Sequence, residues 1–167
     1  MLILIGGGAR SGKSSAALEF GNNALNSGKK ALFVATAEAV DQEMSDRISK
    51  HKADRDPRYL LIEEPRDLCR ALGSHLDHEI AIIDCLTLWL SNQMFADKNY
   101  DFESIINEAR NRSGDTVFVT NETGEGIVPM HPVSREFRDL SGHMNQYFAR
   151  ACDEVYFMRF GLMQKVK

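Results

Sequence analysis

The sequence predicts an α/β fold in a single domain, with a mostly parallel sheet flanked by helices. Short apolar runs alternate along the chain with longer segments of helical spacing. Connections as long as these helices are crossovers rather than hairpins, and crossovers join parallel strands. A chain of 167 residues with 43% hydrophobic content can bury one substantial core, and no repeat, low-complexity tract or linker divides residues 1–167.

The first strand, the first helix and the second strand are marked by their boundaries. Residues 1–5 are a continuous apolar run followed by glycines, which predicts a buried strand. Residues 14–26 carry an apolar stripe at helical spacing, and Gly28 ends the predicted helix. Residues 31–36 are again mostly apolar and predict the second strand.

The following elements are more polar. Residues 41–53 predict a charged helix, because Met44 and Ile48 share one helical face. Residues 59–63 predict a strand. Residues 65–76 predict a helix that has proline at its start, where the missing N–H does no harm.

The middle of the chain repeats the alternation. Residues 80–84 predict a buried strand, and the apolar segment 86–95 predicts a helix. Residues 96–100 are polar and predict a loop, after which residues 102–112 resume helical spacing. Residues 116–120 predict the next strand.

The last third of the sequence predicts a loop, a long helix and two more strands. Residues 121–126 are polar and glycine-containing, which predicts a loop. Residues 134–152 predict the longest helix, and residues 154–158 a strand. Residues 161–167 predict a final edge strand.

Composition excludes several classes of protein. A net charge of −4 and a pI near 5.7 leave no basic surplus, so nucleic acid is not an expected partner. No run approaches the roughly 18 apolar residues that a membrane span requires, and we expect a cytoplasmic protein without a membrane span. Cys69, Cys85 and Cys152 are too widely spaced for a paired metal motif and are expected to be buried free thiols.

A glycine-rich segment after the first predicted strand matches the phosphate-binding pattern G-x-x-x-x-G-K-[ST]. In this pattern backbone N–H groups surround a phosphate at a helix N-terminus, the lysine reaches the β and γ oxygens, and the serine binds Mg²⁺. A chance glycine-rich turn is the alternative, but the flanking strand and helix favour the phosphate loop. The predicted nucleotide-binding residues are Gly7, Gly8, Ala9, Arg10, Ser11, Gly12, Lys13 and Ser14.

Two acidic residues follow other predicted strands. Asp84 ends the strand at residues 80–84 and resembles the acid that holds the nucleotide's Mg²⁺ together with Ser14. Its alternative role is that of a helix cap. Glu122, next to Asn121, ends another strand at what should be the same edge of the sheet, where open parallel sheets bind ligands. Glu122 is expected to support the nucleotide, and an exposed turn carboxylate is the alternative.

These features predict nucleotide binding without selecting one reaction. A switch GTPase would need a base-reading Asn-Lys-x-Asp motif, which the sequence lacks. Phosphoryl or nucleotidyl transfer to a small molecule is the favoured class. A small-molecule kinase with no covalent intermediate and a regulatory nucleotide-binding protein are the alternatives.

Four segments together resemble one known family over nearly the whole chain. They are GGARSGKS at 7–14, ATAEAVDQEMSDRISKHKADR at 35–55, TNETGEGIVP at 120–129 and SREFRDLSGHMNQYFARACDEVYF at 134–157. The family is the bifunctional adenosylcobinamide kinase and adenosylcobinamide-phosphate guanylyltransferase of cobalamin biosynthesis. The resemblance implies a P-loop NTPase fold related to RecA and a homotrimer.

The resemblance also implies two consecutive reactions. The family phosphorylates the aminopropanol hydroxyl of adenosylcobinamide with ATP or GTP, and then transfers GMP from GTP to that phosphate through a guanylylated histidine, releasing pyrophosphate. By position, that histidine is similar to His51, and Glu63 is similar to an acid that touches the guanylyl group. From the residues alone, the favoured interpretation of His51 is a solvated residue of a charged helix, beside Lys50, Lys52 and Arg55.

The chain departs from the family pattern after His51. Lys52, Asp56, Tyr59 and Leu61 stand where the family tends to have Arg, Pro, Trp and Thr. Tyr59 can still offer a stacking ring.

The segment that begins at Ser134 suggests further contacts. Arg135, Arg138 and Asn145 are expected to reach substrate or a neighbouring subunit. For the two arginines, surface pairing with Asp139 or Glu136 is the alternative.

Overall fold

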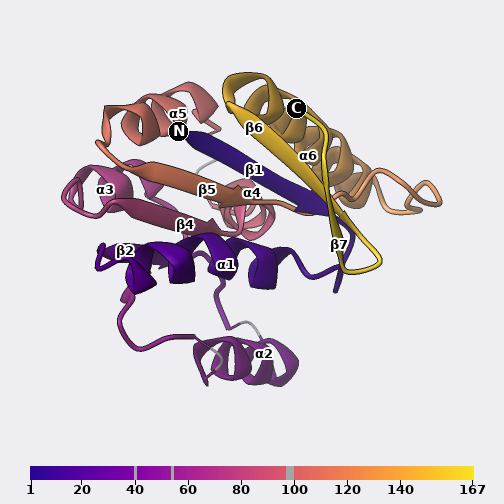
Figure 1. The fold of residues 1–167 in the computed structure, drawn as a ribbon. Helices are drawn as coiled ribbons and strands as arrows, with labels where there is room; N and C mark the ends of the chain where they lie inside the picture. Colours follow the sequence, from indigo (N-terminus) through magenta and orange to yellow (C-terminus); the bar gives the residue numbers. More distant parts are fainter. Residues whose placement is uncertain (40, 54, 97–99) are drawn as a thin grey trace.

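A sheet of seven strands runs through the middle of the molecule, and helices cover both of its faces (Figure 1). The computed structural model describes residues 1–39, 41–53, 55–96 and 100–167. The strands lie in the order β3-β2-β4-β5-β1-β6-β7. They are β1 (Leu2–Gly7), β2 (Ala31–Ala35), β3 (Leu60–Glu63), β4 (Ile80–Asp84), β5 (Asp115–Val119), β6 (Glu154–Arg159) and β7 (Leu162–Lys165).

The sheet is parallel except at one edge. Strands β1 to β6 all pair in parallel with their neighbours. β7 runs antiparallel to β6, and Met158 of β6 pairs with Met163 of β7. Within the described ranges six helices connect the strands, and most of them belong to crossover connections. They are α1 (Lys13–Asn26), α2 (Gln42–Ala53), α3 (Leu68–Gly73), α4 (Leu86–Met94), α5 (Phe102–Asn111) and α6 (Pro132–Ala151).

Both faces of the sheet are buried, as the alternation along β1 shows. Leu2 and Leu4 belong to one apolar core, whereas Ile3 and Ile5 belong to the other. Successive side chains of a strand point to opposite faces, so a strand that is apolar at every position needs cover on both sides. This is why residues 1–5 read as one uninterrupted apolar run.

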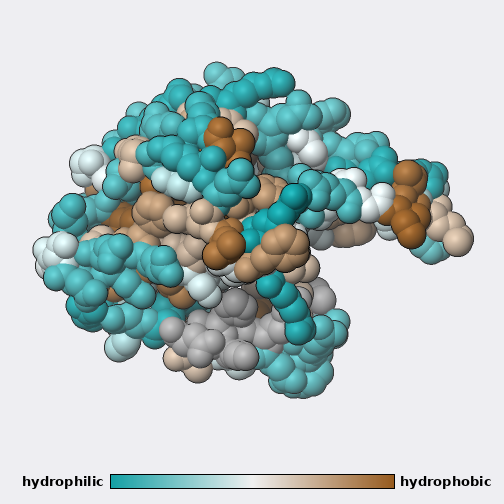
Figure 2. Space-filling view, turned by 45° about the vertical axis from the view of Figure 1, so that its right-hand side comes forward, coloured by the Kyte–Doolittle hydropathy of each residue, from teal (hydrophilic) through white to brown (hydrophobic). Residues whose placement is uncertain are grey.

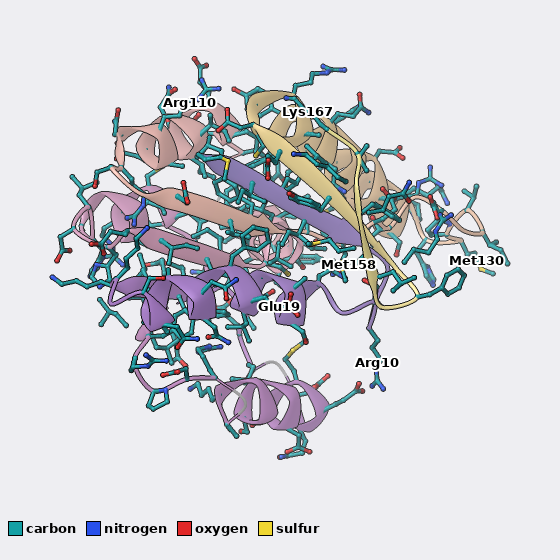
Figure 3. All side chains as sticks on the ribbon, in the orientation of Figure 1. Arg10, Glu19, Arg110, Met130, Met158 and Lys167 are labelled. Atoms are coloured by element: carbon teal, nitrogen blue, oxygen red, sulfur yellow. The ribbon has the colours of Figure 1, made fainter. Side chains whose placement is uncertain are left out.

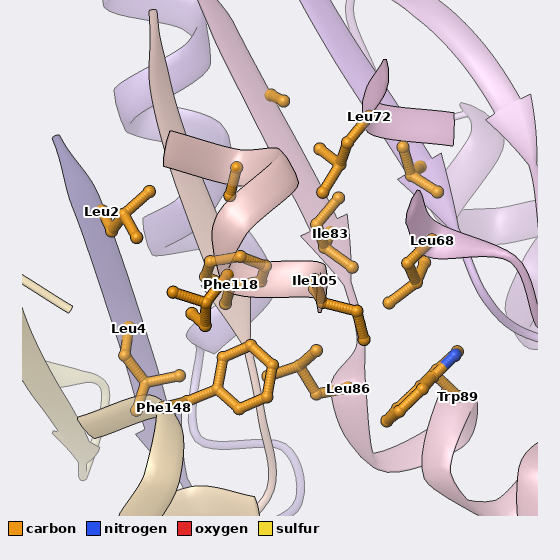
Figure 4. Packing of buried hydrophobic residues seen from close by; sticks show 14 of the residues in the cluster. Leu2, Leu4, Leu68, Leu72, Ile83, Leu86, Trp89, Ile105, Phe118 and Phe148 are labelled. Carbon is orange, nitrogen blue, oxygen red and sulfur yellow. The ribbon is translucent and has the colours of Figure 1, made fainter. Parts of the chain in front are cut away.

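The larger core lies between the sheet and helices α3 to α6 (Figure 4). Leu68, Trp89, Ile105 and Phe148 bring one side chain from each of these helices into it. Phe148 meets Phe118 of β5 edge-on, with ring centroids 5.0 Å apart. The second core lies under α1, which packs its small apolar residues against the opposite face. Helix α2 lies beyond α1, away from the sheet (Figure 1).

The predicted fold class is confirmed, and one element needs correction. The helix predicted for residues 65–76 with proline at its start is wrong in its bounds, because α3 spans only Leu68–Gly73. Asp67 caps it by accepting a hydrogen bond from the Arg70 N–H at 2.9 Å. Pro65 therefore lies before the cap. The predicted loop at residues 96–100 falls largely on residues 97–99, which lie outside the described residues.

The predicted edge strand in the tail is confirmed as β7. β1 extends two residues beyond the predicted end, because Gly6 and Gly7 pair with Phe157 and Met158 of β6. Within the described ranges, no helix is long and apolar enough to cross a membrane.

Candidate active site

The phosphate loop follows the carboxyl end of β1, on the side of the sheet where β2, β4 and β5 also end, and it leads into α1 (Figure 1). Two of its glycines have backbone conformations that suit glycine, with φ of 150° at Gly7 and 97° at Gly12. Gly12 is the left-handed N-cap residue of α1, and its carbonyl accepts a hydrogen bond from Ala16 N at 2.9 Å. Arg10 extends from the loop into solvent (Figure 3). The loop thus presents the N-terminus of α1 at the sheet edge, as an anion site requires.

Lys13 curls back over this loop. Its side chain is only 7% exposed, and Nζ donates to the carbonyl oxygen of Gly8 and lies 3.5 Å from Ser11 Oγ. Burial lowers the pKa of Lys13, while the nearby Cys85 and Asp84 oppose that shift. The ammonium group is therefore held inside the loop and within electrostatic reach of Asp84.

Asp84 is half-buried at the last position of β4. The N-cap of α4 is Cys85, so Asp84 precedes the cap position that the alternative interpretation gave it. Burial raises the pKa of Cys85 to about 12, which keeps this neighbouring thiol neutral and unreactive. Ser14 lies in the first turn of α1 and is half-buried.

Ser14 and Asp84 offer a hydroxyl and a carboxylate, two kinds of group that bind Mg²⁺ at nucleotide sites. The described residues contain no group of three or more His, Cys, Asp or Glu that could hold a metal by themselves. Mg²⁺ at nucleotide sites is usually bound by one or two protein oxygens together with phosphates and water, so a single carboxylate and one hydroxyl match its requirements. The charge of Asp84 acts on Lys13 of the phosphate loop, so this carboxylate lies close to the loop.

The side chains of Thr87, Thr120 and Asn145 form a hydrogen-bonded group around Asn121, and this group was not predicted from the sequence. Thr120 Oγ1 donates to Asn145 Oδ1 at 2.6 Å, and Asn145 Nδ2 donates to the carbonyl of Asn121 at 3.0 Å. Thr87 Oγ1 accepts from Asn121 N at 2.7 Å. α4, α6 and the end of β5 are thereby linked at the point where the chain passes the phosphate loop.

Glu122 adjoins the phosphate loop through its backbone. Its N–H donates to the carbonyl of Gly7 at 3.0 Å, and its carboxylate accepts from the N–H of Gly124 at 2.5 Å. The side chain thus accepts a hydrogen bond within its own turn, and Glu122 is half-buried.

The end of α2 and the residue Arg55 that follows it contact two strands of the sheet. Lys52 forms an ion pair with Glu63, the last residue of β3, and both side chains are exposed. The Arg55 guanidinium lies over the ring of Phe33 in β2, 3.5 Å from its centroid. His51 belongs to the last turn of α2, but its side chain, like those of Arg47 and Lys50, lies outside the described residues.

The start of α6 supports a projecting arm at residues 123–131 (Figures 1 and 3). Arg135 holds the arm by donating to the carbonyls of Pro129 and Met130. Arg138 pairs with its neighbour Asp139, the surface alternative considered for it. Apolar side chains gather toward the tip, where Ile127 is 97% and Met130 86% exposed (Figure 2).

Comparison with known families shows which family the chain belongs to. Residues 3–166 match the family described as cobinamide kinase / cobinamide phosphate guanyltransferase. The chain belongs to this cobinamide kinase and guanyltransferase family. The resemblance found in the sequence is thereby confirmed, and so is the prediction of a transferase of cobalamin biosynthesis with kinase and guanylyltransferase activities.

Three curated relatives of the cobinamide kinase family match nearly the full chain. The bifunctional adenosylcobalamin biosynthesis protein CobP of Pseudomonas aeruginosa is 37% identical over 98% of this chain and 96% of its own length. The proteins named CobU of Escherichia coli and Salmonella typhimurium are 31% and 33% identical, with full coverage of both chains.

A solved structure outside the cobinamide kinase family has the same fold. The flagellar accessory protein FlaH from Methanocaldococcus jannaschii superposes with a TM-score of 0.59, covering 99% of this chain and 77% of its own, at 12% identity. At this identity the likeness concerns the fold alone.

Proposed function

We propose that the chain phosphorylates the aminopropanol hydroxyl of adenosylcobinamide with ATP or GTP, and then transfers GMP from GTP to that phosphate through a guanylylated His51. Membership of the cobinamide kinase and guanyltransferase family supports the two activities. The observation that carries the site assignment is the approach of the phosphate loop, Asp84 and the end of α2 to one edge of the sheet.

The kinase step transfers the γ-phosphoryl group, and it needs groups that hold the phosphates and balance their negative charge. The substrate hydroxyl attacks the γ-phosphorus, the new P–O bond forms, the bond to the β–γ bridging oxygen breaks, and the hydroxyl proton passes to solvent. Lys13 balances the negative charge that accumulates on the β and γ oxygens, and the backbone N–H groups of the loop hold the phosphates. Ser14 and Asp84 would hold Mg²⁺, which when bound offsets phosphate charge.

The guanylyl step needs a nucleophile that can also leave. A neutral imidazole nitrogen of His51 attacks the α-phosphorus of GTP, a P–N bond forms, and the bond to pyrophosphate breaks. An oxygen of the cobinamide phosphate then attacks the same phosphorus, and the P–N bond breaks. Glu63 ends β3 and pairs with Lys52 of α2, and we propose that it contacts the guanylyl group.

We further propose that the chain acts as a cytoplasmic homotrimer. Large apolar side chains on the arm, including Ile127 and Met130, would be exposed in a monomer, and burial between subunits would remove them from water. All three cysteines are free, which suits a reducing compartment. Light scattering on a size-exclusion column tests the trimer, and a monomeric mass would exclude it.

Labelled GTP tests the two-step reaction. Incubation with α-labelled GTP and Mg²⁺, followed by denaturation, should leave label on the protein, and a phosphoramidate should be labile in acid and stable in alkali. His51→Asn should abolish the label and GMP transfer while adenosylcobinamide phosphorylation persists, because that step uses the phosphate loop. Label on the His51→Asn protein would place the nucleophile elsewhere.

The two alternatives give different outcomes in the same experiment. A kinase without a covalent intermediate would phosphorylate adenosylcobinamide but take up no α-label. A regulatory nucleotide-binding protein would turn over neither substrate.

A further inference from the structure

The turn between β6 and β7 carries an exposed aromatic side chain on a strained backbone. Arg159 pairs with Leu162 across the two strands, so Phe160 and Gly161 are the two central residues of the turn. Both have positive φ, 55° at Phe160 and 75° at Gly161, as in a tight two-residue hairpin loop. Glycine, asparagine and aspartate suit such positions, whereas a bulky side chain there is unfavourable. Phe160 is 93% exposed, so packing in a core does not offset this cost.

This turn lies against the phosphate loop, beside the start of α1 (Figure 1). A Cβ atom on Gly12, the N-cap of α1, would lie 3.8 Å from Gly161 Cα and 3.4 Å from Met158 Cε. In the described part of the chain, the other non-glycine residue with positive φ is Arg10, which belongs to the phosphate loop itself. Strained backbone conformations concentrate at ligand-binding and active sites. Here the two strained residues belong to two neighbouring segments at the proposed phosphate site.

The turn contacts two parts of the molecule and leaves its aromatic ring uncovered. Through Gly161 it adjoins the phosphate loop, and through Arg159, 3.6 Å from Glu125, it adjoins the arm at residues 123–131. Neither contact covers Phe160. A nucleotide bound by its phosphates at the loop extends its nucleoside past the segments that border the loop, and the turn is one of these segments. An exposed ring at this place is suited to stack on the flat face of a base.

Phe160 and Glu63 lie on opposite sides of the phosphate loop. In the sheet, β6 is next to β1, whereas four strands separate β6 from β3, which Glu63 ends. Because neighbouring strands lie about 4.8 Å apart, one base cannot contact both residues. Glu63 is proposed to contact the guanylyl group, so the turn is available to the nucleotide of the kinase step. Stacking uses the π face that every base has, and therefore suits a phosphoryl donor that is ATP or GTP.

We propose that Phe160 stacks on the base of the nucleotide that donates the γ-phosphoryl group. The inference rests on the proposed function and adds a base-binding residue to the phosphate site. It also gives a reason for phenylalanine in a turn that favours asparagine or glycine, since the ring contributes to ligand binding rather than to stability. The loop still binds the phosphates, so the loss of Phe160 should affect the affinity for the donor and not the transfer of phosphate.

The test compares ATP with tripolyphosphate, which has no base, by titration calorimetry in the presence of Mg²⁺. Phe160→Asn removes the ring and introduces a residue that suits the turn. It should weaken ATP binding about 5- to 150-fold, the range of base stacking on an aromatic side chain, and change tripolyphosphate binding by less than about twofold. The melting temperature should stay the same or rise, because asparagine tolerates positive φ. Phe160→Trp should retain the ATP affinity, whereas Phe160→Leu, which is apolar without a flat ring, should not.

Leu162→Thr is the matched control, since Leu162 is an apolar side chain of β7 that is 72% exposed. It should leave the ratio of ATP to tripolyphosphate affinity unchanged. An unchanged ratio in Phe160→Asn would overturn the role of Phe160, and a lower mass by light scattering in that variant would assign the ring to a contact between subunits. A wild type that binds neither ligand would instead reject the proposed function. If Phe160→Asn does not fold, the comparison of Phe160→Trp with Phe160→Leu decides.

Discussion

The backbone oxygen of Met158 occupies the space into which a side chain at Gly7 would extend. A Cβ atom on Gly7 would lie 2.6 Å from that oxygen and 2.8 Å from Ser11 Oγ. Met158 pairs with Gly7 in the β1–β6 ladder, so neither backbone can retreat without breaking the sheet. The first glycine of the phosphate loop is therefore required by the neighbouring strand as well as by the ligand.

Gly7→Ala should destabilise the protein, because it combines a close contact with backbone at a φ of 150° that suits glycine. We expect a loss of about 1–3 kcal/mol, which lowers the melting temperature by roughly 2–4 °C for each kcal/mol. Gly8→Ala is the control for stability, since its Cβ would meet no atom within 4 Å. Equal melting temperatures for both variants would contradict the steric argument.

Lys13→Ala should reduce both activities by roughly 10² or more while the fold survives. The lysine is buried at a cost to its charged form, so its removal should leave the melting temperature unchanged or higher. Steady-state kinetics and thermal unfolding measure the two effects, with the exposed Lys29→Ala as control. A variant with near-normal turnover would refute the assignment of Lys13 to the phosphates.

Asp84→Asn should shift the Mg²⁺ dependence of both reactions to higher metal concentration. An amide is a poorer Mg²⁺ ligand than a carboxylate, whereas an asparagine would serve well as a helix cap. Since Cys85 is the N-cap of α4, we expect the metal effect to dominate. Titration of activity with Mg²⁺ measures it, and superimposable curves for variant and wild type would exclude Asp84 as a ligand.

Asn145→Ala should weaken nucleotide binding indirectly, through the loss of the hydrogen bonds that Asn145 makes to Thr120 and Asn121. The change removes the acceptor of Thr120 and the donor to Asn121, and we expect a stability loss of about 1–3 kcal/mol. The freed segment includes Glu122, whose N–H bonds to Gly7, so the phosphate loop loses a support. GTP affinity and chemical denaturation should both report the loss. Gln146→Ala, on the exposed side of α6, should change neither quantity.

The fold could be predicted because its signals are local. A strand buried on both faces is apolar at every position, as at residues 1–5, and a helix carries a stripe, as at residues 14–26. The start of α3 was misplaced because Pro65 resembles a first helical residue, while the cap at Asp67 is only two residues further on.

The site was predictable only where it follows a contiguous motif. The phosphate loop is such a motif, and Asp84 follows from strand periodicity. The Thr87, Thr120 and Asn145 group comes from three separate elements, and nothing in the spacing of these residues indicates their contact. Arg55 looked like one more charge beside a charged helix, because its contact with Phe33 depends on how the chain returns over β2.

The position of β1 inside the sheet, between two strands from late in the chain, has a consequence for biosynthesis. β1 is flanked by β5 and β6, so its hydrogen-bonding partners reach as far as Met158. On the ribosome, an apolar segment from Leu2 to Ile5 must therefore wait unpaired until more than a hundred later residues have emerged. During that interval it is open to chaperones and to aggregation. The phosphate loop, although translated early, acquires its shape only when the nascent chain has released β6.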